Sequence, residues 1–166
     1  METFLMFLAT SLVLRIPSPR FQRYLLGQSR CTALLPSGHN RLHIKYTKEG
    51  DKVYFNDATI ENVTYGLICV NMENLYTIRQ AETILIQYIT GMRKPLHIAH
   101  NTGMQLSYER GQITIADYWQ DVEGKDWMVR GYSDGKTVAV LYVKNVTEIA
   151  VHEHDVFLNG FRFSSN

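Results

Sequence analysis

The sequence has little of what identifies the common protein classes. Only two of its 166 residues are cysteine, too few for a disulfide framework. It contains no nucleophile elbow, phosphate-binding loop, HExxH or CxxC pattern. These absences exclude the most recognisable hydrolases, kinases, nucleotide-binding enzymes and thiol oxidoreductases.

Clustered charge is also scarce. The longest run of basic residues is Arg93-Lys94, and the chain beyond residue 40 is slightly acidic. A protein that binds a phosphate backbone normally shows a basic patch or stripe, so nucleic acid is not an expected partner. With 45% hydrophobic and 20% charged residues, the composition is that of a globular protein.

Long apolar runs are absent as well. Phe4–Leu14 has eleven residues, about half of what a membrane-spanning helix needs, so no membrane span is expected. Glu2 precedes this run and arginines follow it, whereas a secretory signal has its positive charge before the apolar core. We expect residues 1–40 to be an N-terminal extension, either a targeting segment or a disordered one, ahead of a single domain at 41–166. A cytoplasmic location is favoured, with organellar targeting by residues 1–40 as the alternative.

The two cysteines lie in different settings. Cys31 falls in the extension, whereas Cys69 lies in the apolar run YGLICV and is most simply a small buried hydrophobic residue. A disulfide between them remains an open alternative.

The domain begins with a strand pattern. Residues 41–47 alternate polar and apolar side chains, and a second strand at 53–55 is followed by a polar break at Asn56-Asp57. A third strand ends at Val70. These segments predict an antiparallel meander.

Residues 72–90 have the strongest helical pattern, with apolar residues at three- and four-residue spacings. Asn71 is the expected N-cap, and Gly91 followed by Pro95 predicts the C-terminal end.

Period-two patterns return after the helix. Two hairpins are predicted, one around Glu109–Gly111 and one around Asp134-Gly135, with a polar loop at 120–126 between them. Residues 137–143 are apolar on both faces, which indicates a central strand. Residues 147–151 and 156–163 are read as further strands.

This order of elements predicts an α+β fold in which one long amphipathic helix packs against a curved antiparallel sheet. The architecture is a roll, of the broad kind seen in cystatin-like and NTF2-like proteins by analogy only.

Histidines and acids supply the candidate catalytic or metal-binding groups. If the segment VHEHD continues a strand, His152 and His154 point to one face and could hold a divalent metal such as zinc. Asp117 shares a face with Ile113, Ile115 and Trp119, so burial there would make its carboxylate a candidate acid or base. His97 and His100 are its candidate companions. The alternative is that these groups are structural or solvated and that no cofactor is bound.

Aromatic residues supply the candidate binding surface. Tyr118, Trp119, Trp127 and Tyr132 surround one polar loop and, where exposed, would contact a partner. At least two of the four are expected in the core.

The preferred interpretation is a small non-catalytic domain that binds a protein or a small ligand through its sheet face and this aromatic region, with a homodimer through sheet edges also open. The alternative is a small enzyme, metal-dependent or not, with an Asp/His site.

Overall fold

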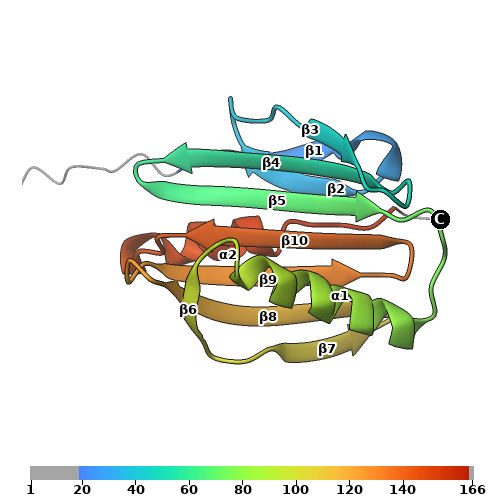
Figure 1. Ribbon diagram of the computed structural model, residues 1–166. Helices are drawn as coiled ribbons and strands as arrows, with labels where there is room; N and C mark the ends of the chain where they lie inside the picture. The colour runs from blue at the N-terminus through green and yellow to red at the C-terminus, as the bar shows by residue number, and fades with distance from the viewer. Residues whose placement is uncertain (1–18, 165–166) are drawn as a thin grey trace, which may run out of the picture.

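The computed structural model describes residues 19–164. Ten strands, two α-helices and two short 3-10 helices make up this part of the chain (Figure 1). The strands, in chain order, are β1 (Phe21–Leu25), β2 (Thr32–Pro36), β3 (His43–Tyr46), β4 (Lys52–Ile60), β5 (Val63–Asn71), β6 (Ile98–Asn101), β7 (Gln105–Glu109), β8 (Gln112–Asp121), β9 (Asp126–Ser133) and β10 (Thr137–Lys144). The helices are η1 (Gly27–Ser29), α1 (Ile78–Arg93), η2 (Glu148–Ala150) and α2 (Val151–Leu158).

Eight strands form one sheet in the order β3-β4-β5-β10-β9-β8-β6, with β7 also paired to β8. All pairs in the described residues are antiparallel, which confirms the α+β class and the antiparallel sheet. Both predicted hairpins form, and β10 lies in the middle of the sheet as its apolar sequence indicates.

The two faces of the sheet carry separate cores. On β10, Val138 and Val140 pack under α1, while Ala139, Leu141 and Val143 pack on the other face. That other face is covered by α2 and by the two-stranded sheet of β1 and β2, so the molecule has three layers (Figure 1). A strand buried on both faces needs this arrangement, because successive side chains point to opposite sides.

The prediction of a roll around one helix is therefore wrong in part. A second helix, α2, forms from the segment VHEHDVFL, which the sequence pattern assigned to strands. His154, Phe157 and Leu158 are the buried residues of this helix, at the three- and four-residue spacing of a helical face. The segment is short, and the spacing of its apolar residues fits a helix as well as a strand.

Residues 21–36 belong to the folded domain, which corrects the boundary expected near Arg41. Leu26, Cys31, Ala33 and Leu35 are buried in the core between β1–β2 and the sheet. The backbone of Thr32 also bonds in both directions with that of Arg162, which ties β2 to the C-terminal segment. The expected targeting or disordered role of residues 1–18 lies outside the described residues.

Helix α1 starts later than predicted and ends later. Thr77 is the N-cap: its hydroxyl accepts the backbone N–H of Gln80, whose side chain accepts the backbone N–H of Thr77. Asn71 is instead the last residue of β5, because pairing with β10 extends that strand to the end of its apolar run. Gly91 lies inside the helix, which stops just before Pro95.

The predicted break at Asn56-Asp57 does not interrupt the sheet. Strand β4 continues through it because the buried Asn56 side chain donates to the backbone carbonyls of His39 and Arg41. The turn falls at Glu61-Asn62, where both residues have a positive φ.

The packing of α1 depends on a glycine in β9. A Cβ at Gly131 would lie 2.6 Å from Cδ1 of Ile89 and 3.0 Å from Cδ1 of Leu85. The missing side chain lets the buried face of α1 approach the sheet closely.

Candidate functional site

The strand register places a set of side chains together on the face opposite α1. Tyr118 on β8 is directly across from Met128 on β9, which packs in the core on the α2 side. Two residues further on, His100, Gln120 and Asp126 form a row across β6, β8 and β9. Directly opposed residues of an antiparallel pair share a face, so these five side chains face the same way.

A pocket of about 440 Å³ lies at this place. Its lining combines these five residues with Asn101 at the end of β6, Thr102 just after it, Val146 after β10, and Trp119 and Trp127 in the strands of the sheet. The volume is in the range of small-ligand pockets, and it has room for about one or two large side chains of a ligand or partner. Tyr118, Met128 and Val146 supply its apolar side-chain surface, with polar groups around them.

The four aromatic residues predicted to make a contact surface are split by the structure. Tyr118 is 43% exposed and borders the pocket. Trp119 and Trp127 are buried, with ring centroids 6.4 Å apart. Tyr132 donates its hydroxyl to the carbonyl of Leu158 in α2, 2.6 Å away, and burial raises its pKa to about 12. The expectation of at least two core residues is met, and Tyr118 is the exposed member of the group.

Asp117 faces α1, as the alternation of β8 predicts, and its side chain is fully buried. Its Oδ2 accepts from Arg93 Nη2 at 2.5 Å and from Trp119 Nε1 at 2.6 Å, while Oδ1 accepts the backbone N–H of Tyr118. Both oxygens of this carboxylate therefore accept hydrogen bonds from groups of the fold itself. It also lies on the face away from the pocket and from His100, so the predicted Asp/His pairing does not form.

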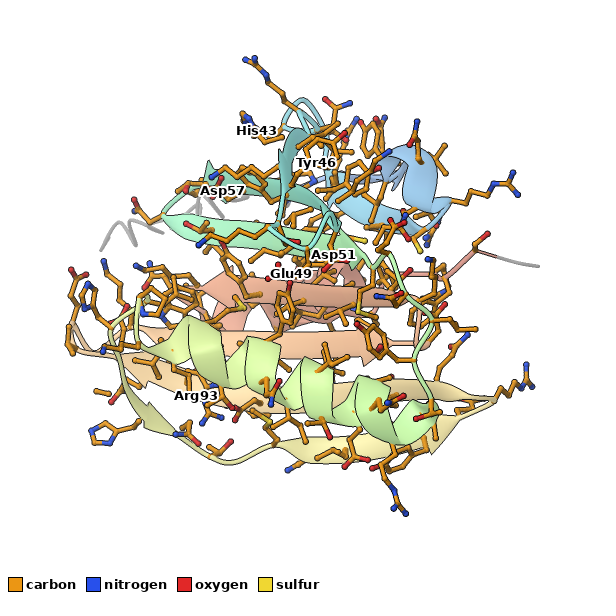
Figure 2. All side chains as sticks on the ribbon, turned by 45° about the vertical axis from the view of Figure 1, so that its right-hand side comes forward. His43, Tyr46, Glu49, Asp51, Asp57 and Arg93 are labelled. Atoms are coloured by element: carbon orange, nitrogen blue, oxygen red, sulfur yellow. The ribbon has the colours of Figure 1, made fainter. Side chains whose placement is uncertain are left out.

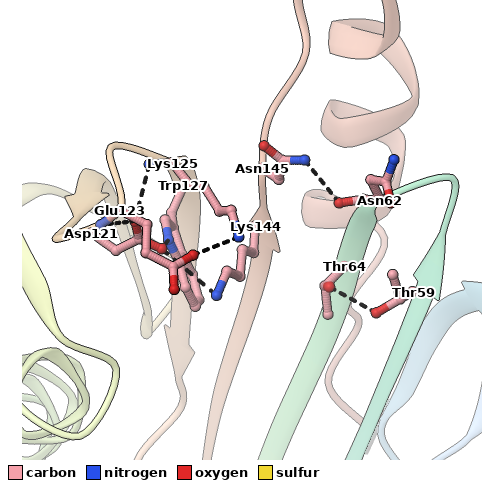
Figure 3. Close-up of polar contacts among 9 residues, drawn as sticks. All are labelled: Thr59, Asn62, Thr64, Asp121, Glu123, Lys125, Trp127, Lys144 and Asn145. Carbon is pink, nitrogen blue, oxygen red and sulfur yellow. Dashed lines mark hydrogen bonds and ion pairs between the residues drawn. The ribbon is translucent and has the colours of Figure 1, made fainter.

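A second buried carboxylate repeats the arrangement at the end of β8 (Figure 3). Asp121 accepts Nε1–H of Trp127 at 3.1 Å, and its other oxygen accepts the backbone N–H groups of Glu123 and Lys125. Burial raises the pKa of Asp121, but these hydrogen bonds and the nearby Lys144 outweigh it and hold the pKa below its usual range. The loop between β8 and β9 is thereby fixed beside the pocket.

His152 and His154 do not form the predicted pair, because residues two apart on a helix point in different directions. His152 is exposed, whereas His154 is fully buried against Tyr65. The backbone N–H of Thr147 donates to Nε2 of His154 at 3.4 Å, so Nδ1 carries the proton and donates to the Tyr65 hydroxyl at 3.2 Å. Burial lowers the pKa of His154, which is neutral in this setting.

The remaining candidate histidines, His97 and His100, both lie at β6. His97 is exposed just before this strand, with a positive φ of 54°. His100 is exposed on β6 at the pocket. His43, which the sequence did not single out, lies on β3 at the opposite edge of the sheet, far from Arg93 at the end of α1 (Figure 2). Within residues 19–164, no group of three or more His, Cys, Asp or Glu side chains is arranged to hold a metal ion.

Few ionisable side chains line the pocket. Its ionisable lining groups are His100 and Asp126, and Asp126 accepts a hydrogen bond from Gln120 at 3.1 Å. The sequence indicated Tyr118 and the loop but not Met128, Val146 or Asn101. Only the pairing of strands distant in sequence brings these residues together.

Comparison with known proteins finds a protein of similar fold and identifies no family. No family model matches the sequence, and no curated protein matches it significantly. The solved structure of cyanobacterial PsbP (CyanoP) from Synechocystis sp. PCC 6803 is similar, with a TM-score of 0.55 and 12% sequence identity over 88% of this chain and 93% of that chain. In the described residues, no helix has the length and apolar character needed to cross a membrane.

Proposed function

We propose that this protein is a non-catalytic interaction domain that holds a partner protein by inserting one of the partner's large apolar side chains into the pocket beside Tyr118. The observation that carries the proposal is the pocket itself, an apolar surface of Tyr118, Met128 and Val146 within a rim of polar groups that includes Asp126 and His100. Protein interfaces have this anatomy, with an apolar centre and a polar, partly wet rim.

Two further features support a protein partner over a free small molecule. Val122 is 70% exposed in the loop that joins the pocket residues Gln120 and Asp126, so a partner protein can contact this loop as well as the pocket. The loop that carries it is held by Asp121, so the surface is preformed and little is lost in ordering it. The likeness of the fold to cyanobacterial PsbP is compatible with an interaction role and does not identify the partner.

The test is a selection of displayed random peptides on the immobilised chain. We expect the enriched peptides to share one large aliphatic or aromatic residue, and Tyr118→Arg to weaken their binding about tenfold or more. Tyr108→Arg is the matched control, because Tyr108 is another exposed tyrosine, on β7, and it is directly opposite Ile113 on the α1 face.

Equal binding by both variants would refute the assignment to this pocket. Binding of a medium-chain fatty acid with loss on Tyr118→Arg, in the absence of any enriched peptide, would replace the protein partner with a small apolar ligand. A dimer that dissociates on Tyr118→Arg would make the partner a second copy of the chain.

A further inference from the structure

The chain's two cysteines, 38 positions apart in the sequence, meet in one core. Cys31 precedes β2 and Cys69 lies on β5, and both are free thiols with almost no exposed surface. The packing of β1 and β2 on the sheet brings them together.

Several contacts locate the two sulfurs. Sγ of Cys31 lies 3.8 Å from Oγ1 of Thr137 on β10 and 3.6 Å from the carbonyl of Ser29. Cys69 pairs with Ala139 and Thr137 with Asn71, so Thr137 and Cys69 are diagonal neighbours on the same face. Both thiols therefore lie next to Thr137 in one core, close enough for each to affect the pKa of the other.

This contact gives the two thiols different acidities. The hydrogen bond from Cys69 lowers the pKa of Cys31 to about 6, although burial opposes the change. The same bond and burial raise the pKa of Cys69 well above its usual value. The directions of these two changes favour the thiolate at Cys31 and the thiol at Cys69. The thiolate is the form that attacks a disulfide.

Cys31 is also at the wall of a second pocket, of about 430 Å³, at the opposite end of β8 from the binding pocket. Ser29, Thr137 and Phe163 lie beside it. Arg110 and Lys136 contribute two positive charges to the lining, against one negative charge from Asp134. A small anionic molecule can therefore approach the Cys31 side of the pair.

We propose that Cys31 and Cys69 are a reversible dithiol site, oxidised by exchange with a small disulfide that enters this pocket. The Cys31 thiolate attacks one sulfur of the incoming disulfide, forms a mixed disulfide and displaces one thiolate. Cys69 then gives its proton to the released thiolate and attacks the Cys31 sulfur; a second small thiolate leaves and takes up from water the proton that Cys31 had lost on ionisation. The protein loses two hydrogen atoms as the small disulfide is reduced to two thiols.

The bond would fasten the β1–β2 layer to the central sheet. In the reduced protein, side-chain packing and the Thr32–Arg162 backbone pairing hold this layer in place. A covalent link across a loop of this length restricts the unfolded chain, so the oxidised protein is expected to melt about 5 to 15 °C higher.

The test is incubation of the full chain with oxidised glutathione, followed by intact-mass measurement and mapping of proteolytic peptides. Wild type is expected to lose the mass of two hydrogen atoms, to yield a Cys31–Cys69 linked peptide and to melt at the higher temperature. Addition of reduced glutathione in excess should restore the original mass and melting temperature.

Cys69→Ser separates the two steps, since it should stop at the mixed disulfide on Cys31, while Cys31→Ser should gain no glutathione at Cys69. Should either variant fail to fold, the wild-type peptide map and melting shift decide alone. Wild type that keeps both thiols, or that accumulates glutathione on Cys31 without forming the linked peptide, would overturn the proposal.

Discussion

The indole of Trp119 donates its Nε1–H to Oδ2 of Asp117, two residues earlier on β8, across 2.6 Å. The same oxygen accepts from Arg93 in the last turn of α1, so one buried carboxylate joins the end of the helix to the sheet. The guanidinium of Arg93 also lies 5.8 Å from the Trp119 ring. The three side chains form one structural unit.

Removing this carboxylate is expected to destabilise the fold. Asp117→Ala leaves Arg93 and the Trp119 N–H without their acceptor and should cost about 3 to 5 kcal/mol in the free energy of unfolding. Asp117→Asn keeps an acceptor oxygen and should cost less, about 2 kcal/mol. Urea unfolding followed by tryptophan fluorescence measures both values, and a neutral Asp117→Ala would contradict the structural role.

Two glycines should respond oppositely to the same change. Gly131→Ala places a Cβ against Ile89 and Leu85 and should destabilise the protein by about 1 to 3 kcal/mol. Gly91→Ala, at an exposed position inside α1 with open space around it, should stabilise by about 1 kcal/mol. Thermal unfolding of the two variants checks the order. A stabilising Gly131→Ala would mean that α1 does not pack closely over β9.

Stability should fall as pH drops through the region where histidine titrates. The pKa of buried His154 lies below its ordinary value of 6.5, so the unfolded chain takes up its proton first. The stability that neutral His154 supports is present above about pH 7 and is lost toward pH 5.

His154→Gln should reduce this pH dependence, while His152→Gln, at an exposed position on the same helix, should leave it unchanged. Urea unfolding at several pH values compares the two variants. The same pH dependence in both would assign it to another group.

The two thiols should titrate differently in the folded protein. With the pKa of Cys31 lowered to about 6, thiolate absorbance in the ultraviolet should rise by one thiolate around that pH. Cys69→Ala removes the largest cause of the lowering and should move the midpoint upward. The unfolded thiol holds its proton to a higher pH, so the stability contributed by Cys31 grows between about pH 6 and pH 9 and is lost below this range. A midpoint unaffected by Cys69→Ala would contradict the thiol–thiol contact.

Local patterns were sufficient for much of the sheet. The hairpins at Arg110-Gly111 and Asp134-Gly135, the central position of β10 and the face that Asp117 shares with Ile113 were all predicted, because turns and strand alternation depend on neighbouring residues. The start of α1 was misplaced because Asn71 and Thr77 are both good N-caps, and pairing of β5 with β10 decided between them.

The sequence by itself determined the class of the fold, the alternating faces of β8 and the two hairpin turns that follow α1, since those depend on spacings of two to four residues. Tertiary structure alone decided that residues 21–36 cover the sheet, that VHEHDVFL is a helix, and that Tyr118, Met128 and Val146 share a pocket while Cys31 meets Cys69. The physical reason is that burial of apolar surface selects among locally equivalent conformations, and it acts between residues that are distant in the chain.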